Sequence, residues 1–377
     1  MTTSPAAAPA EGGPVKLARL MSVDALRGFD MFWIVGADGL LEGVRKLGDN
    51  AVTAAVARQL EHCDWAGFHF EDLIFPMFVF LAGVSLVFSL GKLIAEEGQR
   101  GAALRIVRRA ALLYLLGIFY YGGFSTPFAQ IRLLGVLQRI ALAYLFAGFI
   151  FTFCKWRGQI LWCAGLLIGY WTVMTFVPIP GQTPGNFAEG HNLANWIDGR
   201  YLPLRKWDGD HDPEGLLSTL PAIGTCLLGV FAGRWLRGAT RSVWTKAAYL
   251  AAAGVALVVC GWLWNLQFPV IKKIWTSSFV LVAGGYSCLL LAAFHSVIEG
   301  LGWRMWARPF VWIGMNPITI YMMSELVDIG AIDHRFIGGD LRKMLGNYGD
   351  LAGALVGLAI TFGVARFLYK RQIFLRL

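Results

Sequence analysis

Long apolar runs dominate the chain and are separated by short polar stretches. A run of about 20 apolar residues is the length that an α-helix needs to cross the hydrocarbon core of a bilayer. No alternating run is long enough to predict a membrane β-barrel. The pattern predicts about ten transmembrane helices, near residues 22–45, 70–93, 104–124, 132–154, 158–178, 214–236, 243–266, 275–298, 306–329 and 349–370.

The composition supports this interpretation. The chain has 377 residues, of which 56% are hydrophobic and 15% are charged, whereas soluble domains carry roughly 25% charged residues. We therefore predict an all-α polytopic membrane protein. Residues 1–18 are rich in Ala, Pro and Gly and predict a disordered tail, and residues 19–377 form the transmembrane domain.

Lysine and arginine positions predict the orientation. Basic residues such as Arg105, Arg108 and Arg109 are concentrated in the segments that lie inside when the N-terminus is cytoplasmic. Both termini are then inside, and the protein is expected in the plasma (inner) membrane. The net charge of +9 follows from these basic loops, so we expect a lipid bilayer and no nucleic acid as partner.

Ionisable residues inside the predicted helices are candidates for function, because each costs several kcal/mol in lipid. In the first helix, Asp38 follows Arg27 by 11 residues, on nearly the same face and about 16 Å further along the axis. Gln138 and Arg139 lie in the fourth helix. Arg27, Gln138 and Arg139 are the candidates for holding a phosphate-bearing cofactor; the alternative is that the arginines pair with helix aspartates.

The segment EHCDWAGFHFEDLIFPMFVFLAGVSL, residues 61–86, joins a polar loop to an apolar helix. An imidazole at this boundary, His62, can act as a base or nucleophile near neutral pH. Glu71 and Asp72 are interpreted as acids of a helix first turn. A zinc site from His62, Asp64 and His69 has no recognised spacing, so no metal is expected.

Aromatic, amide and carboxylate side chains recur in the predicted extracytoplasmic loops. Rings can stack on the apolar face of a sugar while carboxylates and amides take its hydroxyls. The residues expected to bind such a substrate are Asp64, Trp65 and Trp196 in these loops, together with Asn316 in the apolar segment 306–329.

Several segments together resemble the heparan-alpha-glucosaminide N-acetyltransferase family and its bacterial relatives, within the wider transmembrane acyltransferases. They are SVDALRGFDMFWIVGAD, the 61–86 segment above, RLLGVLQRIALAYL, DPEGLLSTLPAIGTCLLGVFAG and GMNPITIYMMSEL, which follow one another from about Leu20 onward.

The resemblance implies transfer of an acetyl group from cytosolic acetyl-CoA to an amino sugar or glycan, glucosamine-like, on the extracytoplasmic side. The active-site histidine of the family falls on His62. Asp38 occupies the position of an asparagine in the family, and we expect it to orient His62. The resemblance thus implies that residues 19–377 are an acyltransferase domain with acetyl-CoA as co-substrate.

A proton-coupled secondary transporter of a small polar solute is the alternative, because intramembrane Asp, Arg and His also form proton relays. A transporter predicts inverted repeats, and none is visible in the sequence. The sequence leaves open the acceptor, the choice between an acetyl-histidine intermediate and direct transfer, and whether the protein forms a homodimer.

Overall fold

A computed structural model of the chain describes residues 20–48 and 50–375. The tail expected at residues 1–18 lies outside the described residues. Within them, the regular structure is helical and only two isolated β-bridges occur, Ala66–Ile271 and Arg132–Arg205. The α-helices are α1 (Met21–Lys46), α2 (Ala51–Leu60), α3 (Phe70–Tyr120), α4 (Val136–Phe153), α5 (Trp156–Phe176), α6 (Leu193–Tyr201), α7 (Thr219–Arg237), α8 (Val243–Trp264), α9 (Ser277–His295), α10 (Arg308–Gly314), α11 (Pro317–Leu326), α12 (Ile329–Phe336), α13 (Gly339–Leu345) and α14 (Gly349–Lys370).

Seven helical segments of the described chain are long and apolar enough to cross a membrane. The protein is therefore an all-helical membrane protein. The expected number of about ten is not reached by this criterion, for three physical reasons. The α1 helix carries several charged residues, α3 combines two of the expected spans, and the expected span 306–329 is divided into α10 and α11.

The α3 helix consists of two arms that meet at Gly98. Its φ of 75° is non-helical, and glycine adopts this angle without steric cost. Buried residues from both arms, including Leu90 and Ile106, pack in one cluster with Tyr144 and Phe151 of α4. The two arms therefore form a helical hairpin, in agreement with the predicted helices at 70–93 and 104–124.

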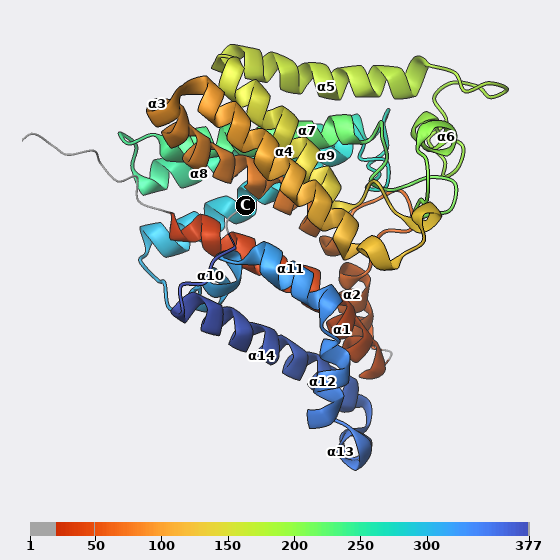
Figure 1. Ribbon diagram of the computed structural model, residues 1–377, viewed down its shortest axis with the longest axis vertical. Coiled ribbons are helices and arrows are strands. Elements are labelled where there is room, and N and C mark those ends of the chain that lie inside the picture. The colour runs from red at the N-terminus through yellow and green to blue at the C-terminus, as the bar shows by residue number, and fades with distance from the viewer. Residues whose placement is uncertain (1–19, 49, 376–377) are drawn as a thin grey trace, which may run out of the picture.

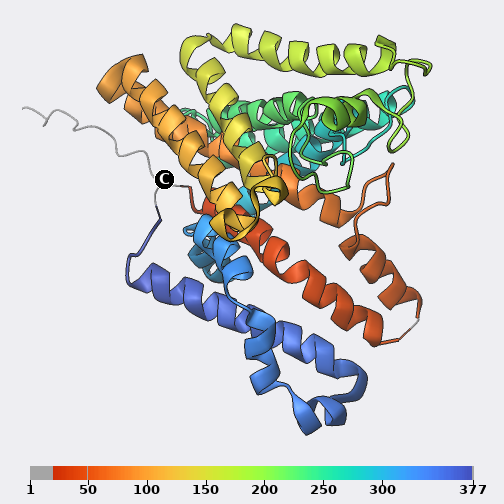
Figure 2. The same ribbon diagram turned by 45° about the vertical axis from the view of Figure 1, so that its right-hand side comes forward.

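The helices run back and forth between two ends of the bundle (Figure 1). One end holds the start of α1 and the Gly98 turn, and we call it the Arg27 end. The other holds α2, α6, α12 and α13, and we call it the His62 end. Figure 2 shows α1 running beside α14 and below the group formed by α3, α4, α5 and α7.

Glycines let two helix pairs, α3 with α7 and α1 with α10, approach closely. A Cβ atom on Gly83 of α3 would lie 1.9 Å from a carbonyl of α7, and one on Gly229 of α7 would lie 1.9 Å from a carbonyl of α3. Gly28 and Gly314 play the same part between α1 and α10. Small residues at helix contacts are typical of membrane bundles, where van der Waals packing holds helices together.

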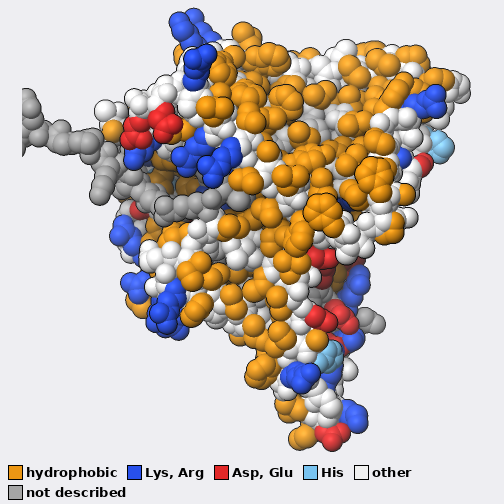
Figure 3. Space-filling view, in the orientation of Figure 1, with side chains coloured by type: hydrophobic (Ala, Val, Ile, Leu, Met, Phe, Trp, Pro, Cys, Tyr) orange, Lys and Arg blue, Asp and Glu red, His pale blue; other side chains and the backbone are white. Residues whose placement is uncertain are grey.

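Apolar side chains also cover much of the molecular surface. In Figure 3 they spread over the face formed by α3, α4 and α5, while Lys and Arg gather at the left-hand edge and the lower tip. Leu161 of α5 is 72% exposed and Leu263 of α8 is 61% exposed. Such a surface is stable in contact with lipid and not with water.

Candidate active site

His62 lies in the short loop between α2 and α3, at the His62 end. The α2 helix begins with a capping box in which the Asn50 side chain accepts from the backbone N–H of Thr53 and the Thr53 hydroxyl accepts from that of Asn50. The loop that follows reverses the chain before α3 begins at Phe70. The His62 side chain is 58% exposed, so its ring is accessible from outside the bundle.

The carboxylate that contacts His62 belongs to Asp72, in the first turn of α3. The His62 Nδ1 atom lies 3.1 Å from Asp72 Oδ1. The other carboxylate oxygen accepts from the backbone N–H groups of His69 at 3.0 Å and Cys63 at 3.2 Å. Asp72 is fully buried. These bonds fix the carboxylate so that it can orient the imidazole.

A lysine from a distant loop completes this group. Lys272 Nζ lies 3.0 Å from Nδ1 and 3.4 Å from Nε2 of His62, and 3.5 Å from Asp72 Oδ1. Burial lowers the pKa of the Lys272 ammonium below its ordinary value. The negative charges of Asp72 and Glu71 act in the opposite direction but do not outweigh burial. His62, Asp72 and Lys272 therefore form one charged cluster.

Asp38, the expected partner of His62, lies elsewhere on the same side of the bundle. Its side chain is exposed on α1, and it is close enough to Glu71 of α3 for the two charges to interact. Among the described residues, the carboxylate in contact with the His62 ring is that of Asp72. The structure thus brings Asp38 near the start of α3 and assigns it no contact with His62.

Asp64 and Trp65 line a groove of about 640 Å³ between α2 and the loop that follows it. The Trp65 indole N–H donates to the Phe187 carbonyl at 2.8 Å, which ties this loop to the segment before α6. Asp64 is exposed in the groove. These two predicted substrate-binding residues therefore share one solvent-facing depression beside His62.

Trp196 and Asn316, the other predicted substrate-binding residues, do not join this groove. Trp196 lies in α6, where its ring meets that of Tyr201 at 6.1 Å. Asn316 is buried at the junction of α10 and α11. Its side chain donates to the Ile373 carbonyl at 3.0 Å and accepts from the Leu375 N–H at 3.3 Å. Asn316 therefore holds the segment after α14, near the Arg27 end.

The predicted cofactor residues occupy opposite ends of the bundle. Arg27, in α1, donates to Ser85 Oγ at 2.5 Å and to the Gly314 carbonyl at 3.1 Å, and pairs with Asp24. Gln138 and Arg139 lie in the first turn of α4, which begins at the His62 end. The structure does not bring Arg27 together with Gln138 and Arg139.

Arg139 is fully buried yet incompletely hydrogen-bonded. Its Nη2 donates to Ser218 and to the Gly215 carbonyl, while Nε and Nη1 have no partner among the described residues. Its guanidinium lies 4.8 Å from the centre of the Trp275 ring. Trp275 and Lys272 belong to one loop, so that loop contacts both Arg139 and His62.

A second arginine at this end forms an ion network. Arg132 donates to Asp212 at 2.6 and 2.9 Å and to Glu214 at 2.5 Å. Its guanidinium lies 4.7 Å from the centre of the Tyr121 ring and 4.9 Å from that of the Trp207 ring. Burial alone would lower the pKa of Arg132. The hydrogen bond with Asp212 and the negative charge of Glu214 outweigh this effect, so the pKa of Arg132 is raised above its ordinary value. Because Asp212 and Glu214 belong to the long loop before α7 and Arg132 directly precedes α4, this network holds that loop against the start of α4.

Two groups of three side chains bring metal-ligand atoms within 4.8 Å of one another, one at the start of α3 and one in the loop around α6. In the first group, His69 Nδ1 contacts the Glu61 carbonyl and Asp72 accepts two backbone bonds. In the second, the Lys273 ammonium bridges Glu189 at 2.7 Å and Asp208 at 3.3 Å. Internal partners thus occupy both groups, and we assign a metal to neither.

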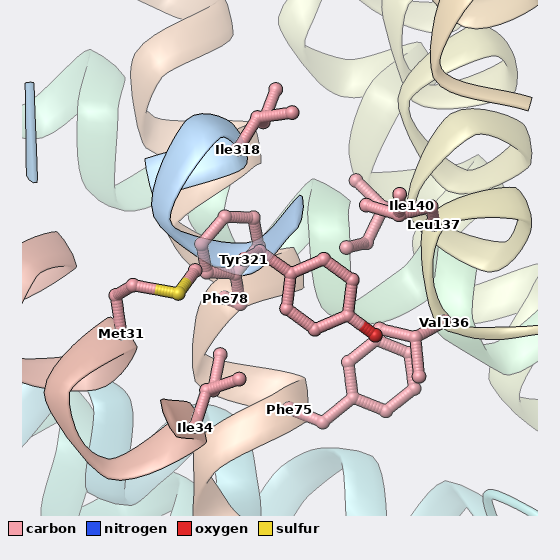
Figure 4. A pocket seen from close by; sticks show the side chains of 9 residues that line it. All are labelled: Met31, Ile34, Phe75, Phe78, Val136, Leu137, Ile140, Ile318 and Tyr321. Atoms are coloured by element: carbon pink, nitrogen blue, oxygen red, sulfur yellow. The ribbon is translucent and has the colours of Figure 1, made fainter. Parts of the chain in front are cut away.

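A small apolar cavity of about 20 Å³, roughly the room that one water molecule needs, lies between α1, α3, α4 and α11. Figure 4 shows its side chains facing one another, with the Tyr321 hydroxyl as the one oxygen drawn. Phe75 is three residues beyond Asp72 on α3 and meets the Trp275 ring at 5.0 Å. The cavity is lined by Met31, Ile34, Phe75, Phe78, Val136, Leu137, Ile140, Ile318 and Tyr321.

Buried polar atoms of α1 also lack partners near this cavity. Both carboxylate oxygens of Asp30 and the indole N–H of Trp33 have no hydrogen bond within the described part of the chain. Asp30 directly precedes Met31, which lines the cavity. The middle of α1 therefore carries buried polar atoms whose hydrogen-bonding capacity is unused within the described part of the chain.

Fold and site together define a polytopic membrane protein with an imidazole–carboxylate pair at one end of its helices. Residues 19–263 match the model of the heparan-alpha-glucosaminide N-acetyltransferase catalytic family. The chain belongs to this family, as its motifs predict.

Two curated relatives are named heparan-alpha-glucosaminide N-acetyltransferase. The human protein is 26% identical over 371 aligned residues, which cover 83% of this chain and 55% of the relative. The mouse protein is 26% identical over 372 residues, covering 83% of this chain and 56% of the relative. The chain thus spans about half the length of the curated relatives it matches.

Proposed function

We propose that this protein is a membrane acetyltransferase that moves an acetyl group from acetyl-CoA to the amino group of a glucosamine-like sugar. The observation that carries the proposal is the contact between His62 and the buried Asp72, in a chain of the N-acetyltransferase family. The acetyl donor and the acceptor are inferred from the name of the family and from the chemistry of the site.

The His62 ring is suited to the central chemical step. If its Nδ1–H donates to Asp72, and the Lys272 ammonium, 3.4 Å from Nε2, donates to the Asp72 carboxylate instead, the Nε2 lone pair can take the proton of the attacking amine or the acetyl group itself. Asp72 stabilises the cationic ring that results, as a carboxylate does in a catalytic triad. Both routes end with the acetyl group on nitrogen and a proton on the released CoA thiol.

The two ends of the bundle suggest separate entrances. We place the Arg27 end in the cytoplasm, where Arg27 would contact the CoA phosphates, and the His62 end on the extracytoplasmic side. The apolar cavity and the unpartnered atoms of Asp30 and Arg139 would face the thioester arm on its way to His62. Asp64 and Trp65 would contact the sugar in the solvent-facing groove.

The test is transfer in sealed proteoliposomes of known orientation. Acetyl-CoA labelled in the acetyl group is supplied on one side and glucosamine on the other, and labelled N-acetylglucosamine is measured. Product is expected only when acetyl-CoA is on the Arg27 side and the sugar on the His62 side. Solute uptake that depends on a proton gradient, without acetylation, would instead support the transporter alternative.

A further inference from the structure

The loop between α8 and α9 is anchored by its backbone beside His62. The Gly67 N–H donates to the Val270 carbonyl at 2.9 Å, and Ala66 and Ile271 form a β-bridge. A further bond at 2.9 Å runs from the Trp275 N–H to the Lys272 carbonyl. The position of Lys272 next to His62 is therefore set by the main chain as well as by its side chain.

His62 Nδ1 has two competing neighbours. A carboxylate can only accept a hydrogen bond and an ammonium group can only donate one. Nδ1 can therefore either donate its proton to Asp72 or, when unprotonated, accept from Lys272, but it cannot do both. When Nδ1–H donates to Asp72, Lys272 has the same carboxylate oxygen as its partner at 3.5 Å. This arrangement leaves Nε2 unprotonated, which is the form that acyl transfer needs.

We propose that Lys272 is a positioning residue of the transfer reaction, whose ammonium group holds Asp72 and opposes protonation of the His62 ring between turnovers. The inference rests on the proposed function for its kinetic consequence. Asp72 alone favours the imidazolium form, because opposite charges in contact stabilise each other. Lys272 offsets that effect, and the cluster keeps a neutral imidazole close to a buried carboxylate.

Other charged and titratable groups around the cluster come from several elements. They are Arg58 on α2, Cys63, Asp64 and His69 in the following loop, Glu71 and Asp72 on α3, Asp38 on α1, and Glu214 in the loop before α7. Among the described residues, the ring itself contacts Asp72 and Lys272. These two groups are therefore expected to dominate its protonation.

The experiment compares the pH dependence of kcat/KM for acetyl-CoA and glucosamine in three variants. In Lys272→Met, the midpoint of the acid limb should rise by about 1–2 pH units, since a neighbouring charge shifts ionisation by roughly 1–3 units. Lys272→Arg should keep the midpoint near that of the wild type. Lys273→Met is the matched control for the midpoint, because Lys273 contacts Glu189, Asp208 and the Trp65 ring rather than His62.

A second measurement does not depend on transfer. Diethyl pyrocarbonate modifies neutral imidazole, so mass spectrometry of the His62 peptide as a function of pH follows the ring directly. Its midpoint should also rise in Lys272→Met, or in Lys272→Gln if the methionine variant does not fold. An unchanged midpoint in a folded variant overturns the role of Lys272. Absence of transfer in the wild type counts against the proposed function and leaves this assay intact.

Discussion

The Nδ1 atom of His62 lies 3.1 Å from Oδ1 of Asp72, a fully buried carboxylate at the start of the next helix. The loop between the two residues also holds the Asp72 carboxylate in place, because the backbone N–H groups of Cys63 and His69 donate to its other oxygen. The geometry of the pair is therefore built into one short segment, and Asp72 takes the position in which Asp38 was expected.

Asp72→Asn is expected to impair transfer more than Asp38→Asn. The amide keeps the shape and can still accept backbone bonds, but it cannot stabilise a cationic ring, so the transfer rate should fall by about 10²–10⁴-fold. Asp38 has no contact with the His62 ring among the described residues, so its replacement should cause a smaller loss. The measurement is kcat for both variants under saturating acetyl-CoA; a larger loss in Asp38→Asn would restore Asp38 as the orienting group.

His62→Ala should abolish most transfer without abolishing donor binding. Removal of the imidazole removes general-base or nucleophilic catalysis, worth about 10²–10⁴ in rate. Wild-type activity should rise with pH as the ring loses its proton, since the neutral form is required. Transfer is measured beside CoA binding by calorimetry, with His69→Ala as the control. Near-normal transfer in a folded His62→Ala protein would exclude His62 from the mechanism and direct attention to His69 or Asp38.

The membrane helices could be predicted because lipid imposes a simple length and composition on each span. The two arms of α3, for example, agree closely with the predicted helices at 70–93 and 104–124. The sequence could also identify His62 as the candidate, since an imidazole at the edge of an apolar helix is unusual. Its partners were harder to identify.

The sequence predicts Asp72 in the first turn of a helix, where acids are common because they offset the helix dipole. This assignment is right for its position but misses its contact with His62. Lys272 lies 210 residues from His62 in sequence, and only tertiary folding brings them together. Asn316 shows the opposite case, an amide in an apolar segment whose bonds hold the chain after α14.

Arg27→Ala is expected to weaken CoA binding roughly tenfold or more, because each charge-assisted contact to a phosphate contributes about 1.5–3 kcal/mol. Arg45→Ala is a suitable control on the same helix, since Arg45 lies at the His62 end and pairs with Glu61 at 2.6 Å. Calorimetric titration with CoA measures both. Unchanged affinity in a folded Arg27→Ala protein would assign Arg27 a structural role, through contacts such as those with Ser85, Gly314 and Asp24.

Asp198 provides a prediction about stability and pH. This residue of α6 is buried, and its Oδ1 accepts from the Leu216 N–H at 2.8 Å. Burial raises the pKa of Asp198 to about 6, whereas an unfolded aspartate titrates near 3.9. The folded protein therefore binds a proton more tightly than the unfolded chain. The stabilisation is complete below about pH 3.9 and is lost as pH rises through about 6, by roughly 3 kcal/mol in total.

Asp198→Asn should remove this part of the pH dependence, because the amide keeps the acceptor and never ionises. We expect the melting temperature of the variant in detergent, followed by tryptophan fluorescence, to fall less between pH 4.5 and pH 7.5 than that of the wild type. Asp340→Asn is the matched control, since the Asp340 side chain is 93% exposed and pairs only with Lys343 among the described residues. If the melting temperatures of wild type and Asp198→Asn fall by the same amount over this pH range, Asp198 ionises normally in the folded protein. Hydrogen bonds from backbone N–H groups such as that of Leu216 would then stabilise its charged form.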